Sequence, residues 1–60
     1  MLSLAKLPYN HYAWYHNDKC MFIGHYTEVL AYGYWTFGLA KSEVYKALDS
    51  LHKAGEKIFI

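Results

Sequence analysis

The chain has 60 residues, of which 55% are hydrophobic and 20% aromatic, and it carries a net charge of +1. This length allows one domain at most, with marginal stability. The single Cys20 excludes an internal disulfide, and no apolar run approaches the roughly 18 residues that span a bilayer. Residues 1–6 lack the apolar segment of a signal peptide, so we expect a cytoplasmic protein without a membrane segment.

The aromatic content also predicts a partner. One small core cannot hold seven Tyr, two Trp and three Phe, so some of these rings are expected at the surface. Clustered exposed aromatic side chains are typical of protein interfaces. We therefore expect a homodimer.

Pro8 marks the first segment of the chain. Proline cannot continue a helix, and it favours an extended conformation at Leu7. Residues 1–10 are therefore interpreted as an N-terminal arm, which has some strand character. Residues 11–60 are interpreted as the single small domain.

Residues 11–26 predict a β-hairpin. Two aromatic-rich stretches flank the turn signal at residues 17–19. A two-residue loop would pair His16 with Lys19 and Trp14 with Met21, whereas a three-residue loop would shift the pairing by one. In either register both faces are largely apolar, so we expect one face to cover helices and the other to meet a partner.

Residues 27–37 are the most ambiguous segment. Thr27 followed by Glu28 is typical of a helix N-cap with an acid in the first turn. Gly33 costs roughly 1 kcal/mol relative to Ala within a helix, and residues 34–37 have strand-like composition. The alternatives are one helix to about residue 36, or a short helix and an extended piece. We favour the single helix.

Residues 40–54 predict the strongest helix. Val44, Leu48 and Leu51 fall on one buried stripe, and Gly55 supplies a C-terminal stop. Residues 56–60 then predict a short strand, which could add to the hairpin as a third strand. The fold class is therefore α+β, with an N-terminal β-hairpin, a helix-turn-helix and a short C-terminal strand.

Residues 37–48 resemble the turn and second helix of helix-turn-helix DNA-binding proteins. The matching positions are Phe37, Gly38, Leu39, Val44, Ala47 and Leu48. The continuation to Ile58 resembles a winged helix, and the combination of hairpin, Ile23-Gly24, this motif and a final strand resembles small phage-type proteins. These families place a small residue four positions before the turn glycine, where the helices cross, whereas this chain has Tyr34.

The resemblance implies a DNA-binding face on the second helix. Its residues would be Lys41, Ser42, Tyr45 and Lys46, which lie off the buried stripe. In such proteins this part of the helix enters the major groove. The low net charge and the absence of Arg are unusual for a DNA-binding protein.

The chain is not expected to hold a metal or to act as an enzyme. His16, Cys20 and His25 do not have a zinc-finger spacing, and no hairpin face collects more than two ligands. Cys20 beside a histidine is the only candidate catalytic pair, and a buried structural thiol is the better interpretation. We expect no cofactor and no metal.

Two function hypotheses follow from the sequence. The first is a small sequence-specific regulator that binds double-stranded DNA as a dimer, in a host cytoplasm if it is phage-encoded. The second is a small phage-type inhibitor or adaptor that binds a host protein. Its interface would be the aromatic hairpin, with Tyr12, Trp14, Tyr15 and Phe22.

Overall fold

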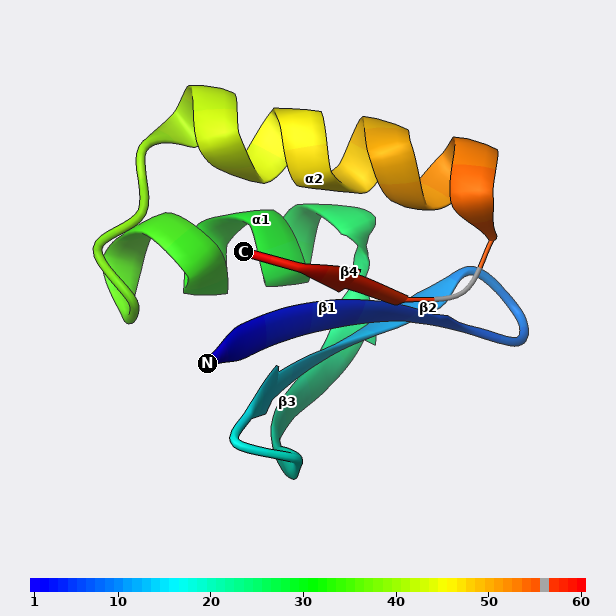
Figure 1. Cartoon of the computed structure of the whole chain (residues 1–60), viewed down its shortest axis with the longest axis horizontal. Coiled ribbons are helices and arrows are strands. Elements are labelled where there is room, and N and C mark those ends of the chain that lie inside the picture. Colours follow the sequence, from blue (N-terminus) through cyan, green and yellow to red (C-terminus); the bar gives the residue numbers. More distant parts are fainter. Residues whose placement is uncertain (56) are drawn as a thin grey trace.

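The computed structural model describes residues 1–55 and 57–60 (Figure 1). Its elements, in chain order, are β1 (Leu2–Leu7), β2 (His11–His16), β3 (Lys19–His25), α1 (Tyr26–Trp35), α2 (Lys41–Ala54) and β4 (Lys57–Phe59). The α+β class is confirmed, as is the order of hairpin, two helices and short C-terminal strand.

The four strands form one antiparallel sheet in the order β3-β2-β1-β4. Residues 2–7, which were predicted to belong to an arm outside the domain, form an inner strand, in which Ser3 and Leu4 are buried. β4 pairs with β1 and not with the β2–β3 hairpin. The sequence could not indicate this neighbour, because a three-residue strand carries little pairing information.

The β2–β3 hairpin has a two-residue turn, which decides between the two loop lengths that the sequence left open. Asn17 and Asp18 both have positive φ, of 51° and 67°, and His16 lies opposite Lys19. Such a turn matches the twist of the two strands. A bulge then shifts the register, so that Trp14 lies opposite Phe22 and not Met21. The bulge consequently turns Phe22 toward the same face of the sheet as Trp14.

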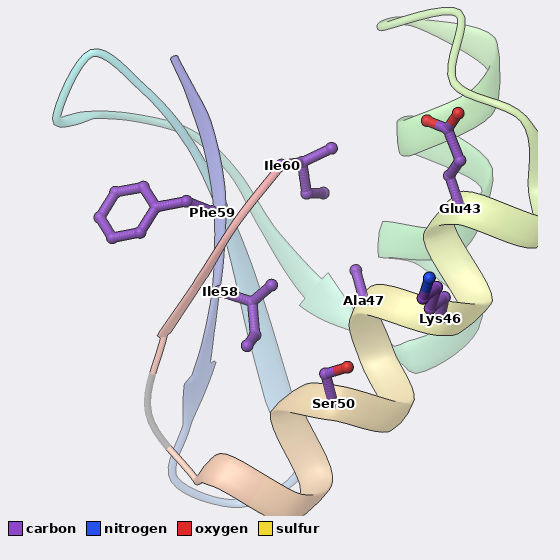
Figure 2. Close-up of a pocket in the computed structure, with 7 residues that line it drawn as sticks. All are labelled: Glu43, Lys46, Ala47, Ser50, Ile58, Phe59 and Ile60. Carbon is purple, nitrogen blue, oxygen red and sulfur yellow. The ribbon is translucent and has the colours of Figure 1, made fainter.

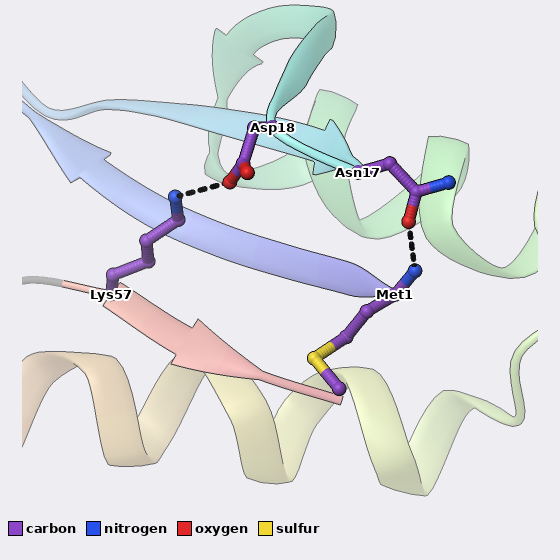
Figure 3. A network of polar contacts seen from close by, with 4 residues as sticks. All are labelled: Met1, Asn17, Asp18 and Lys57. Carbon is purple, nitrogen blue, oxygen red and sulfur yellow. Dashed lines mark hydrogen bonds and ion pairs between the residues drawn. The ribbon is translucent and has the colours of Figure 1, made fainter.

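Polar contacts tie this turn to β1 and β4 (Figure 3). The amino group of Met1 donates to the Asn17 side-chain oxygen, and the Asn17 backbone N–H donates to the Met1 carbonyl at 3.0 Å. The Lys57 ammonium lies 4.0 Å from the Asp18 carboxylate. The N-terminal residue and the first residue of β4 therefore contact the same hairpin turn.

Helix α1 begins earlier than the sequence predicted. Its N-cap is His25, not Thr27, and the His25 backbone N–H donates to the Glu28 carboxylate at 2.9 Å. Gly33 stays within the helix, which continues to Trp35. A Cβ at position 33 would lie 2.8 Å from the Trp14 ring and 3.1 Å from a Val44 methyl group. Gly33, and not position 34, is therefore the small residue that lets α1 approach α2.

Helix α2 follows the predicted pattern closely. Gly38 in the preceding turn and Gly55 at the C-cap have φ of 72° and 89°, in the left-handed region that glycine tolerates best. Val44, Leu48 and Leu51 are completely buried. The predicted stripe is thus the face by which α2 packs on the core.

Both helices cover one face of the sheet and run in opposite directions across it (Figure 1). α1 contacts β2 and β3, while α2 contacts β1 and β4. Trp14 lies fully buried between the layers, and its indole N–H donates to the Val29 carbonyl at 2.8 Å. The core is therefore continuous from the hairpin to both helices.

Candidate functional site

The outer side of α2 exposes all four residues predicted to bind DNA. Lys41, Ser42, Tyr45 and Lys46 are exposed because the opposite side of the helix supplies the core. The Lys41 ammonium lies 5.2 Å from the centre of the Tyr34 ring, which holds it near the start of the helix.

Acidic side chains reduce the positive potential of this helix face. Lys53 forms an exposed ion pair with Asp49 at 3.4 Å, and Glu43 lies in the first turn. Lys41, Lys46 and Lys53 against Glu43 and Asp49 leave a formal charge of +1 on the helix. This is little for a surface that must neutralise several phosphates.

The predicted aromatic interface does not exist as one surface. Tyr12 and Trp14 are buried in the core, and Phe22 packs against it, stacked on Tyr32 with ring centres 4.6 Å apart. Only Tyr15 points to the other face of the sheet. The interface prediction is therefore wrong for three of its four residues, because strand alternation and the bulge direct them toward the helices.

Tyr12, Tyr26 and His52 form a polar cluster at the edge of the core. The Tyr12 hydroxyl and His52 Nε2 share a hydrogen bond of 2.8 Å, and the Tyr26 ring meets the Tyr12 ring edge-on at 6.0 Å. Burial raises the pKa of Tyr26 above 10.0, helped by the negative charge of Tyr45, Tyr12 and Asp49 when they are ionised. The hydrogen bond satisfies the buried Tyr12 hydroxyl, which indicates a structural role.

An apolar groove runs between α2 and β4 (Figure 2). Its volume is about 300 Å³. The residues that line it are Glu43, Lys46, Ala47, Ser50, Ile58, Phe59 and Ile60. The four helix residues follow the i, i+3, i+4, i+7 spacing of one helix flank. Ile58 and Ile60 point from the strand toward this flank (Figure 2).

The second exposed surface is the face of the sheet opposite the helices, here called the open face. Strand register places on it Ser3, Ala5, Leu7, His11, Ala13, Tyr15, Cys20, Ile23, His25, Lys57 and Phe59, with Met21 in the bulge beside them. Ile23, Phe59 and Met21 expose 54%, 62% and 41% of their surface. The open face is therefore unusually apolar for a solvated sheet surface.

Lys57 contacts two aromatic rings at one corner of the open face. Its ammonium lies 4.7 Å from the centre of the Tyr15 ring and 5.7 Å from that of Phe59. At the opposite corner the His11 and His25 rings lie 4.5 Å apart. None of the described strand residues on this face is acidic. The open face thus carries exposed apolar side chains on both edge strands, Ile23 and Met21 on β3 and Phe59 on β4, with basic side chains at two corners.

Neither the groove nor the open face was predicted with its correct residues. The small Ala47 and Ser50 on one flank of α2, together with Ile58 and Ile60, were the available signals for the groove. They become meaningful only once β4 is known to lie beside α2. The open face was predicted in outline, as a second apolar side of the hairpin. Which β3 residues lie on it, however, depended on the unpredicted bulge at Met21.

Among the described residues, no three His, Cys, Asp or Glu side chains gather where they could hold one metal ion. Cys20 is exposed, so its interpretation as a buried thiol is wrong. No helix in the described part of the chain is long and apolar enough to cross a membrane.

Comparison of the chain with protein-family models, with curated proteins and with solved structures finds no match. The geometry of the exposed surfaces is therefore the basis for a functional proposal.

Proposed function

We propose that the protein is a small protein-binding adaptor or inhibitor that recognises its partner with the open face of its sheet. The observation that carries this proposal is the exposure of Ile23, Phe59 and Met21 on a face that the helices leave uncovered. Ala13, Tyr15 and Ala5 lie between these residues on the two inner strands. Exposed apolar surface of this extent is typical of interaction sites.

The charge of the open face favours a different protein, and not a second copy of this chain, as the binding partner. Lys57, His11 and His25 lie on this face, and its described strand residues include no carboxylate. The Asp18 carboxylate of the hairpin turn, 4.0 Å from Lys57, offsets one of these basic groups. Two copies packed face to face would bring basic side chains toward basic side chains. The expected partner instead presents an apolar patch bordered by Asp and Glu.

The test compares the wild-type chain with an Ile23→Thr/Phe59→Thr variant. Threonine keeps the strand propensity and removes the exposed apolar surface. A partner captured from nuclease-treated native lysate is purified and titrated with both chains by calorimetry. We expect binding by the wild-type chain and about tenfold or greater weakening in the variant. Equal affinities would contradict the proposal, and a dimer in light scattering that the variant abolishes would identify a second copy as the occupant.

A second candidate function is sequence-specific binding of double-stranded DNA by α2. The observation that favours it is the joint exposure of Lys41, Ser42, Tyr45 and Lys46 on one helix. DNA binding should weaken as salt rises, and Lys41→Ala should reduce the salt slope by about one per subunit. Tyr45→Ala should lose sequence preference more than affinity. Failure to enrich any sequence from a random duplex library at low salt would exclude this function.

A further inference from the structure

The free edge of β4 has hydrogen-bonding groups that the sheet does not use. Among the described strands, β4 lies at the edge of the sheet and pairs with β1 alone. The Ile60 backbone N–H donates to the Leu2 carbonyl at 2.9 Å, and Ile58 lies opposite Leu4 in the same register. In an antiparallel pair alternate residues direct their N–H and C=O groups to the same neighbour. The N–H and C=O groups of Lys57 and Phe59 therefore point away from β1, toward the free edge.

The groove lies directly along this edge. Ile58 and Ile60 form its strand wall, and Ala47 and Ser50 on α2 form its helix wall (Figure 2). A strand added beside β4 would lie about 4.8 Å from it. Alternate side chains of that strand would enter the groove, and those between them would lie on the open face beside Phe59. Main-chain bonding and a side-chain pocket thus occur at the same edge.

We propose that the edge of β4 and the groove under α2 bind an extended segment of a partner protein as a fifth strand. This site lies across the sheet from Ile23 and Met21 on β3, and it goes beyond the function proposed for the open face. Strand addition of this kind combines main-chain hydrogen bonds, which supply affinity, with pockets for alternate side chains, which supply specificity.

Charge and size define the segment that fits. The groove volume of about 300 Å³ and its wall of Ala47, Ile58 and Ile60 match an aliphatic side chain. Lys46 lies exposed on the rim and matches a carboxylate at a neighbouring position of the segment. Glu43 lies further along the same rim and disfavours a second carboxylate there. The expected segment therefore alternates in polarity, with an aliphatic anchor and an acidic residue near it.

The probe is a phage-displayed library of random peptides, selected against the full chain. We expect enrichment of peptides that combine an aliphatic residue with Asp or Glu at alternating spacing. Synthetic versions of these peptides are then titrated against two variants. Phe59→Pro deletes the outward N–H without removing a bond to β1, and Lys46→Glu reverses the rim charge at an exposed position. Each should weaken binding about tenfold or more, the cost of a lost hydrogen bond or charge pair.

Two matched controls separate this site from the others. Phe59→Ala removes the ring but keeps the main-chain donor, so it should weaken binding much less than Phe59→Pro. Ile23→Thr alters the open face on β3, the edge strand opposite β4, and should leave peptide affinity unchanged. If Phe59→Pro does not fold, the peptide affinity of Lys46→Glu alone tests the proposal.

Three results of the peptide experiments would overturn the proposal. They are the absence of any enriched peptide, unchanged affinity in Lys46→Glu, and loss of affinity in Ile23→Thr equal to that in Lys46→Glu. A dimer in light scattering that Phe59→Pro converts to a monomer would also overturn it, since the occupant would then be β4 of a second copy.

Discussion

The two faces of the sheet differ in how they use aromatic residues. On the helix-covered face Tyr12 and Trp14 are buried. The Tyr12 hydroxyl shares a hydrogen bond with His52, and the Trp14 indole N–H donates to the Val29 carbonyl. On the open face Tyr15 and Phe59 lie beside a lysine, and Ile23 is half exposed. The same residue types therefore stabilise the fold on one face and form an exposed surface on the other. Aromatic content alone does not identify a binding site; the direction of each strand residue does.

The largest expected effect contrasts two neighbouring residues on opposite faces. Trp14→Ala should lower the free energy of unfolding by about 3–5 kcal/mol, which a domain of this size is not expected to survive. Tyr15→Ala, which loses only its contacts with Lys57 and its strand neighbours, should cost less than about 1 kcal/mol. Urea unfolding followed by circular dichroism measures both. Equal losses in the free energy of unfolding would show that the open face contributes as much to stability as the covered face.

The second prediction concerns the close approach at Gly33. Gly33→Ala gains about 1 kcal/mol of helix propensity. The added methyl group, however, meets the Trp14 ring at 2.8 Å and Val44 at 3.1 Å, and overpacking of this kind costs about 1–3 kcal/mol. We expect the free energy of unfolding to fall by about 1 kcal/mol, as measured by thermal unfolding.

A double-mutant cycle tests the cause of the Gly33 effect. In a Trp14→Phe background the ring atom that meets the new methyl group is absent, so Gly33→Ala should become neutral or stabilising. If the loss persists unchanged in that background, contact with Trp14 is not its cause.

A smaller effect is expected in a turn that belongs to neither face. Tyr9 adopts φ of 60° between β1 and β2, a conformation that is unfavourable for a bulky side chain, and it is 90% exposed. Tyr9→Asn should raise the free energy of unfolding by up to about 1 kcal/mol, because asparagine tolerates this region better. A lower melting temperature for the variant would mean that the Tyr9 ring makes a stabilising contact.

The smallest expected effect on stability comes from Tyr26, at the margin of the covered face. It is confined to alkaline pH. Burial raises the pKa of Tyr26 above 10.0, so the unfolded chain loses this proton at a lower pH than the folded chain. The free energy of unfolding should therefore fall as pH rises above 10.0, and Tyr26→Phe should reduce this fall. Urea titrations below and above that pH provide the measurement. Identical alkaline profiles for the two proteins would refute the assignment.

The parts of the fold that depend on local chemistry could be predicted from the sequence. Gly38, Gly55 and the Val44 stripe determine α2, and Asn17-Asp18 locates the hairpin turn, whose loop length the sequence left open. The partner of β4 and the inner position of β1 could not be predicted, because they depend on pairing between segments far apart in the chain. The same distinction explains the outcome for the candidate site. Exposure of Lys41 and Tyr45 follows from helix periodicity, whereas the directions of Phe22 and Ile23 follow from a bulge without a clear sequence signal.

The position of β1 between β2 and β4 has a consequence for synthesis of the chain. The first three strands form a meander from consecutive segments, so they can pair as soon as they leave the ribosome. The other edge of β1 stays unpaired until both helices and then Lys57–Phe59 have emerged. An unpaired strand edge is a template for aggregation with other chains. Pairing of β4 therefore covers the edge of β1 and leaves in its place an edge of three residues, which offers other chains a shorter template.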